Sequence, residues 1–196
     1  MPHAVCLRLP PPSDGLLIKV KDYGNSLELP MDNKHWLDEF HNNRINSVLA
    51  SYTIPDTLHH TLNNEYQQYF SKHEISGIVG IMKNIKSIPA CCAPHTDSRR
   101  ALAINYYIEL GGTNVRTVFY NTILNINGTA TNIQYNDISP IEEHTFQHNW
   151  YAFDVNRCHS VENIESERLF LAIYLNADLN YNLENFQKDY PELICC

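Results

Sequence analysis

The sequence predicts a mainly β protein with flanking α-helices, folded as a jelly-roll sandwich. Helical apolar spacing is confined to the first third of the chain, whereas short runs rich in β-branched and aromatic residues follow Gly77. Helices followed by antiparallel strands are typical of a sheet sandwich that carries its helices on one side. The length adds a limit, because 196 residues with 43% hydrophobic content can build one well-buried core but not two ordinary domains. We therefore expect a single domain over residues 1–196, in which residues 1–75 supply an N-terminal strand and supporting helices and residues 76–180 form the jelly-roll core.

The N-terminal region is expected to contain a strand over residues 16–20 and helices over residues 33–51 and 57–70. The first run is short and apolar, which suits a strand at the edge of a sheet. The two helical segments have apolar residues at intervals of three and four. We expect Pro55 to end the first helix and Asp56 to cap the second.

The strands of the expected sandwich are apolar or alternating runs bounded by turn residues. Asn127 and Gly128 form a dipeptide that is typical of a tight β-hairpin. We expect strands over residues 78–88 (as a pair), 101–110, 116–126, 130–135, 142–154 and 168–175.

Charge and cysteine content limit the partners to be expected. The formal net charge is −8 and Lys and Arg form no run, so we expect no nucleic-acid partner. The N-terminus lacks the apolar core of a signal peptide, and no later apolar run is long enough to cross a membrane, so we expect a cytoplasmic protein with no membrane partner. In that compartment the 6 Cys residues are expected to be reduced thiols.

Three residues form a candidate metal site. His95 and Asp97 are two positions apart, so on an extended chain their side chains point to the same side. His159 is the candidate third ligand. Two imidazoles and one carboxylate on one face of a metal leave the opposite face open, which is the arrangement of non-haem Fe(II) oxygenases.

Arg168 makes this hypothesis more specific. It begins a run in which Leu169, Leu171, Ile173 and Leu175 would share one face of a strand, which places Arg168 on the opposite face. A guanidinium is costly inside a protein unless it has an anionic partner. A planar cation of this kind suits a dicarboxylate co-substrate, which it can hold through two parallel hydrogen bonds.

Together, His95, Asp97, His159 and Arg168 resemble the pattern of the Fe(II)- and 2-oxoglutarate-dependent oxygenases. The resemblance extends over about residues 79–175 and does not include the N-terminal region. The residues around His95 are most similar to those of the small aspartyl/asparaginyl-hydroxylase-like and prolyl-hydroxylase-like members.

The resemblance implies a double-stranded β-helix, the cupin-like form of the jelly roll. It implies that His95, Asp97 and His159 are the catalytic metal ligands for Fe(II), and that 2-oxoglutarate binds the metal and Arg168. It further implies that O2 is consumed and that succinate and CO2 are released as a C–H bond of a substrate is hydroxylated. Asp97 favours hydroxylation, because halogenating relatives have a small residue at that position.

The phase of the strands suggests further pocket residues. In the strand that follows the metal motif, Asn105 and Tyr107 would face the interior at a depth that Arg168 also reaches, and Tyr120 in the next strand is a further candidate. We expect these three residues to contribute to 2-oxoglutarate binding and Arg100 to contact substrate. The alternative for the three is that they are ordinary buried polar groups bonded to the backbone, and for Arg100 that it is a surface residue.

Other histidines and the cysteines leave alternatives open. His144 and His148 compete with His159 as the third ligand, although only His159 lies a short way before Arg168. A cysteine thiolate near the motif would favour a softer metal than iron.

Two other classes of function remain possible. The first is a non-catalytic jelly-roll module with a structural or binding role, and the second is a cupin-type metalloenzyme that does not use 2-oxoglutarate. If the protein is an oxygenase, its short chain favours a small molecule, a free amino acid or a peptide residue as substrate.

Overall fold

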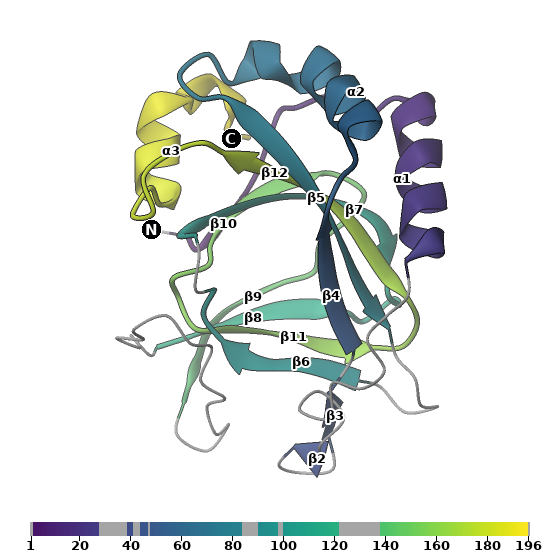
Figure 1. Cartoon of the computed structure of the whole chain (residues 1–196). Coiled ribbons are helices and arrows are strands. Elements are labelled where there is room, and N and C mark those ends of the chain that lie inside the picture. The colour runs from purple at the N-terminus through teal and green to yellow at the C-terminus, as the bar shows by residue number, and fades with distance from the viewer. Residues whose placement is uncertain are drawn as a thin grey trace.

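Two largely antiparallel sheets lie face to face in the computed structural model, which describes residues 2–27, 39–40, 44–46, 48–83, 90–97, 100–121 and 138–195 (Figure 1). Within these residues each sheet has six strands. In spatial order the first sheet consists of β1 (Ala4–Cys6), β10 (Trp150–Asp154), β7 (Leu102–Leu110), β12 (Arg168–Leu175), β5 (Ile75–Lys83) and β4 (Val48–Thr53). The second consists of β2 (Glu39–Phe40), β3 (Arg44–Asn46), β6 (Ala90–His95), β11 (His159–Ile164), β8 (Arg116–Tyr120) and β9 (Pro140–His144).

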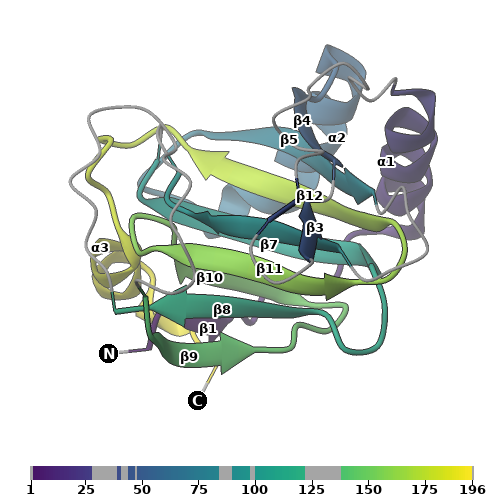
Figure 2. The ribbon, with the colours of Figure 1, turned by 90° about the horizontal axis from the view of Figure 1, so that it is seen from below.

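From β5 onward the chain passes repeatedly from one sheet to the other, except that β8 and β9 are neighbours in the second sheet. Figure 2, which views the molecule from the side of the second sheet, shows β11, β8 and β9 in front of the strands of the first sheet. Among the described strand pairs only β3 and β6 run parallel. The architecture is the jelly roll, or double-stranded β-helix, that the sequence predicted.

Helices cover the outer face of the first sheet (Figure 1). They are α1 (Asp14–Ser26), α2 (Asp56–Tyr66) with the short helix η2 (Gln67–Tyr69), and α3 (Leu183–Asp189) with η4 (Pro191–Leu193). Alternate residues of the central strands serve two separate cores. Leu169 and Leu171 of β12 pack toward the helices, whereas Phe170 and Ala172 pack between the sheets. The predicted phase of this strand is therefore confirmed, and Arg168 shares the inter-sheet face.

The expected strand over residues 16–20 is wrong, because this segment lies within α1. The Ser13 hydroxyl accepts a hydrogen bond from the backbone N–H of Leu16 at 3.2 Å and so caps the helix. Leu16 and Val20, four residues apart, are both fully buried. The run looked like a strand because Leu17 and Ile18 also make it apolar, but Ile18 is exposed.

The expected helix over residues 33–51 is also wrong where it can be compared with the structure. Residues 39–40, 44–46 and 48–51 belong to β2, β3 and β4, and the rest of the range lies outside the described residues. Pairing with β5 along the whole of β4 decides the conformation here, since backbone hydrogen bonds to a neighbouring strand outweigh a weak helical pattern. The second expected helix is confirmed as α2 and η2, but Asp56 does not cap it, because Asp56 is the first helical residue and Pro55 occupies the cap position without a side-chain cap. Pro55 follows the strand β4 and so does not end a helix.

The remaining strand predictions differ in their outcome. The expected strands over residues 101–110 and 168–175 are β7 and β12. The range 142–154 is not one strand, because β9 and β10 lie in different sheets. The structure describes only the first part of the ranges 78–88 and 116–126, as part of β5 and as β8, while the turn at Asn127 and the strand over 130–135 lie outside the described residues. Five elements had no prediction, namely β1, β6, β11, α3 and η4.

A search of the described helices for one that is long and apolar enough to span a membrane finds none.

Candidate metal centre

The pairing of β6 with β11 brings the predicted metal ligands together. His95, the last residue of β6, is paired in register with His159, the first residue of β11, so both imidazoles lie on the inter-sheet face with ring centroids 4.4 Å apart. The backbone N–H of Asp97 donates a 3.0 Å hydrogen bond to the carbonyl of Val155, which holds the loop after β6 against the site. His95 Nε2 lies 3.6 Å from Asp97 Oδ1, and ligand atoms of all three side chains lie within 4.8 Å of one another.

His159 is fixed in the tautomer that a metal requires. Its Nδ1 lies 2.9 Å from the carbonyl oxygen of Arg157. A carbonyl can only accept, so Nδ1 carries the proton and the lone pair of Nε2 is left for a ligand. Burial of the ring, with the nearby His95 as a second cause, lowers the pKa of His159 to about 4. The imidazole is therefore neutral at neutral pH, which is the form that binds metals.

Asp97 is held as a carboxylate by its neighbours. Its Oδ2 accepts a 2.8 Å hydrogen bond from Arg100 Nε. Burial acts to raise the pKa of this carboxyl, but the positive charge of Arg100 and the two histidines outweigh burial, and the pKa lies below its ordinary value. Asp97 thus uses one oxygen toward Arg100 and turns the other toward His95.

The donor set fits a divalent metal with the preferences of Fe(II). It offers two imidazole nitrogens and one ionised carboxylate oxygen, a set associated with non-haem Fe(II) sites that keep positions open for other ligands. Each of the three side chains also contacts a supporting group. The Cys92 sulfur lies 3.8 Å from His95 Nδ1, the Arg157 carbonyl bonds His159, and Arg100 bonds Asp97. Hydrogen-bond partners of this kind orient the metal-ligating side chains and are typical of metal sites.

Arg168 is a buried cation with unused hydrogen-bond donors. Its exposed fraction is only 2%, and its guanidinium carbon lies 4.3 Å from the centroid of the Tyr107 ring. Nε and Nη1 are both buried and have no hydrogen-bond partner among the described residues. Burial lowers the pKa of Arg168, but an arginine remains charged in a protein. An unpaired buried cation of this kind is complementary to an anion, and its planar edge suits a carboxylate.

Asn105 and Tyr107 lie where the strand phase predicts, but Tyr120 does not. Asn105 and Tyr107 are buried on the inter-sheet face of β7, and Asn105 Oδ1 is a further buried atom without a partner in the described part of the chain. On β8 it is Phe119 that faces the interior, with its ring centroid 6.0 Å from that of His159. The Tyr120 hydroxyl instead bonds Ser160 Oγ at 2.9 Å and Glu162 Oε1 at 3.0 Å on the opposite face of the second sheet. The prediction that Tyr120 lines the pocket is therefore wrong, since the period of two on a strand turns it outward.

The competing ligands are engaged elsewhere. His144 Nε2 lies 2.5 Å from Glu142 Oε1, and His148 Nδ1 donates to the Tyr107 carbonyl at 3.0 Å. Burial raises the pKa of the Cys158 thiol to about 11, so it is not a thiolate at neutral pH. Within the described ranges, the group of potential metal ligands contains only the three predicted residues.

Sequence reasoning missed the residues that support the ligands. The Arg157 carbonyl and the Cys92 thiol act through contacts that depend on the pairing of β6 with β11. Sequence spacing gave no signal for either. The position of Arg100, three residues after Asp97, could have suggested the ion pair between them, which we did not predict.

Comparison with known proteins supports the fold and leaves the function open. No protein-family model and no curated protein matches the chain. Among solved structures, the epimerase SnoN in complex with Fe3+, alpha-ketoglutarate and nogalamycin RO has 12% sequence identity and a TM-score of 0.52, over 89% of this chain and 79% of SnoN. A Pseudomonas putida prolyl-4-hydroxylase has 13% identity and a TM-score of 0.41, over 88% of this chain and 91% of the hydroxylase. A Trichoplax adhaerens prolyl hydroxylase in complex with a hypoxia-inducible-factor peptide fragment has 10% identity and a TM-score of 0.44, over 88% of this chain and 83% of the hydroxylase. At such identities the likeness to SnoN shows that the two chains share a fold.

Proposed function

We propose that this protein is a non-haem Fe(II)- and 2-oxoglutarate-dependent dioxygenase. His95, Asp97 and His159 would hold Fe(II), and Arg168 would bind the distal carboxylate of 2-oxoglutarate. The observation that carries the proposal is the combination of a two-histidine, one-carboxylate cluster with a buried guanidinium whose Nε and Nη1 are unpaired. Both features face the space between the two sheets.

When bound, Fe(II) and 2-oxoglutarate supply the oxidative decarboxylation of 2-oxoglutarate by O2 to succinate and CO2, coupled to the oxidation of a substrate C–H bond. The chain's own residues supply binding, orientation and exclusion of water. His159 presents Nε2 because Arg157 takes the proton on Nδ1, and Asp97 presents one oxygen because Arg100 takes the other. Phe146 stacks on Tyr107 with ring centroids 5.0 Å apart and so fixes the ring against which the Arg168 guanidinium packs.

Asn105 and Tyr107 would complete the co-substrate site. Asn105 could donate to a carboxylate only through its amide Nδ2, because Oδ1 is an acceptor. The pKa of the Tyr107 hydroxyl is raised by burial, so this phenol stays neutral and can donate a hydrogen bond to a carboxylate. Two polar side chains beside one guanidinium give the site a directional preference for an anion with two oxygens.

Hydroxylation of an unactivated C–H bond of a small molecule, a free amino acid or a peptide residue is the reaction that we propose. The presence of Asp97 in the ligand set favours this outcome. SnoN is an epimerase whose structure holds Fe3+ and alpha-ketoglutarate, so the shared fold accommodates both groups in that protein without fixing the fate of the substrate.

The two alternatives make different demands on Arg168. A non-catalytic module would bury an unpaired cation for no benefit, although burial without a partner costs several kcal/mol in general (about 3–5). A cupin-type metalloenzyme that does not use 2-oxoglutarate would need the metal cluster but not the arginine. The buried and unpaired state of Arg168 therefore favours the oxygenase.

The proposal is tested by succinate formation from 2-oxoglutarate when anaerobically Fe(II)-loaded protein is exposed to O2. We expect the wild type to form succinate and the His95→Ala and Arg168→Ala variants to form none above background. Arg8→Ala, which removes an exposed arginine, is the matched control and should match the wild type. An Arg168→Ala variant with normal turnover would favour the cupin-type enzyme, and the absence of stoichiometric iron binding by the wild type would favour the non-catalytic module.

A further inference from the structure

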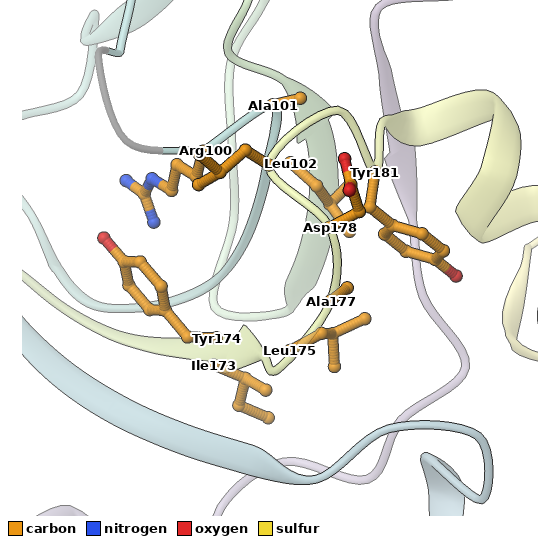
Figure 3. Close-up of a pocket in the computed structure, with 10 residues that line it drawn as sticks. Arg100, Ala101, Leu102, Ile173, Tyr174, Leu175, Ala177, Asp178 and Tyr181 are labelled. Carbon is orange, nitrogen blue, oxygen red and sulfur yellow. The ribbon is translucent and has the colours of Figure 1, made fainter.

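A small pocket lies next to the candidate metal centre, where β7 begins and β12 ends (Figure 3). Its volume is about 60 Å³, and its walls include Arg100, Leu102, Tyr174, Asp178 and Tyr181. Figure 3 shows the Arg100 guanidinium and the Tyr174 ring on one side of the pocket, while Asp178 and Tyr181 lie on the segment that closes the other side. The cationic side is the one nearest Asp97, because Arg100 is the residue that bonds this carboxylate.

Arg100 uses only part of its hydrogen-bonding capacity. Its Nε donates to Asp97 Oδ2 at 2.8 Å, and its guanidinium carbon lies 4.6 Å from the centroid of the Tyr174 ring. Nη1 is buried and has no hydrogen-bond partner in the part of the chain that the structure describes. The stacking fixes the plane of the guanidinium, so the unused donor has a defined direction. A buried donor without a partner is unfavourable, and an acceptor that reaches it gains a charge-assisted bond.

The charge of Arg100 is left over once the proposed metal and co-substrate are counted. Without them, Arg100 and Asp97 neutralise each other. With them, the two positive charges of Fe(II) and the one on Arg168 are matched by Asp97 and the two carboxylates of 2-oxoglutarate, since both histidines are neutral. Arg100 would then remain as a cation that this set does not neutralise, in a pocket whose opposite wall carries the exposed Asp178. The chain as a whole has a net charge of −8, so this positive site is a local feature and not part of a general attraction for anions.

We propose that the oxidised substrate is a small molecule with a carboxylate, and that Arg100 binds this carboxylate through its unused edge at the mouth of this pocket. The inference rests on the proposed function and adds a substrate class to it. Arg100 then has two roles, as a positioning residue for Asp97 and as the anchor for substrate. The pocket admits the carboxylate and a few attached atoms, so the rest of the substrate extends past Tyr174 or over the exposed Leu179.

The test uses propionate and propionamide, two probes of equal size that differ in charge. The full-length protein is loaded anaerobically with Fe(II) and 2-oxoglutarate, and the change in the visible charge-transfer band of this complex is followed as each probe is added. We expect the wild type to bind propionate about tenfold more tightly than propionamide, which corresponds to about 1.4 kcal/mol. In Arg100→Gln the ratio should fall to about one. Each ratio is taken within one variant from the protein that shows the band, so a variant that holds less iron still gives a valid ratio.

Two more variants separate substrate binding from support of Asp97. Arg100→Lys keeps the charge and should keep part of the preference for propionate. This variant replaces Arg100→Gln in the comparison if Arg100→Gln fails to hold iron. Asp178→Asn removes an exposed carboxylate on the opposite side of the pocket and should keep or increase the preference. Equal binding of the two probes by the wild type would overturn the inference, as would a preference that persists in Arg100→Gln. The absence of any charge-transfer band in the wild type would instead refute the proposed function, so the two failures are distinguishable.

Discussion

Replacing Arg168 by methionine should make the protein more stable and at the same time abolish its response to 2-oxoglutarate. Methionine has a similar length and no donors, so it can fill the space of the arginine stem between the sheets. The wild-type side chain is 2% exposed and has two buried donors without partners among the described residues. These features lower the stability of the protein without 2-oxoglutarate and become favourable only when an anion is bound.

The magnitude follows from the contacts of Arg168. Two unpaired buried donors of a charged group cost roughly 3 kcal/mol together. Loss of the contact with Tyr107, whose ring centroid is 4.3 Å from the guanidinium carbon, removes about 2 kcal/mol of cation–π attraction, the value for a desolvated pair. The net gain in the free energy of unfolding is therefore about 1 kcal/mol, or about 2–4 °C in Tm for a chain of this size. Added 2-oxoglutarate at 100 times its Kd should stabilise the metal-loaded wild type by about 2.7 kcal/mol and the variant not at all.

Thermal unfolding of metal-free protein and of Mn(II)-loaded protein, each with and without 2-oxoglutarate, measures both effects. Arg8→Met is the matched control, because it makes the same change at an exposed position and should leave both quantities unchanged. The account of Arg168 is refuted if the metal-free Arg168→Met protein is less stable than the wild type. It is equally refuted if 2-oxoglutarate stabilises the Mn(II)-loaded variant as much as the wild type.

Three further predictions concern the scaffold around the site. Gly80→Ala should destabilise the protein by about 3 kcal/mol in urea unfolding, because an added Cβ would lie 2.0 Å from Cζ of the buried Phe170; a loss below 1 kcal/mol would show that this ring can move aside. Tyr120→Phe should lower the free energy of unfolding by about 1 kcal/mol and leave the Kd for 2-oxoglutarate in the Mn(II)-loaded protein unchanged, whereas a weaker Kd would restore Tyr120 to the pocket. Ser13→Ala should cost about 1 kcal/mol through loss of the α1 cap and of the bond to Glu65, whereas Ser13→Asn should retain most of the stability, and equal losses would argue against capping as the cause.

The sequence could predict those parts of the fold in which the local residue pattern matches the packing of the element in the folded protein. The alternation in β7 and β12 was readable because the two faces of each strand differ, with mostly aliphatic residues packed toward the helices and polar or aromatic residues such as Asn105, Tyr107 and Arg168 between the sheets. His95 and Asp97 could be paired from their separation alone. His159 was chosen because it completes a two-imidazole, one-carboxylate set shortly before Arg168, and Arg168 was chosen from the strand phase and the cost of burying a guanidinium.

The errors arose where a local pattern was ambiguous or where a distant strand decided the structure. Residues 16–20 have apolar residues at the spacing of a helix and at that of a strand, and only the N-cap residue Ser13 distinguishes the two in the sequence. Residues 48–51 lie in a strand because β5 offers a partner of matching length, which no local window contains. Tyr120 was assigned to the pocket although its neighbour Phe119 is the residue in phase with His159, and the register of β8 with β11 cannot be derived from either strand alone.

The measurement that tests the central claim most directly is the binding of 2-oxoglutarate to anaerobic protein with and without Fe(II), followed by the visible charge-transfer band and by equilibrium dialysis. We predict one 2-oxoglutarate bound per chain in the presence of Fe(II), little binding in its absence, and loss of the band in His159→Ala and in Arg168→Met. Binding that is independent of Fe(II), or a band that survives in His159→Ala, would contradict the assignment of this cluster as an Fe(II) and 2-oxoglutarate centre.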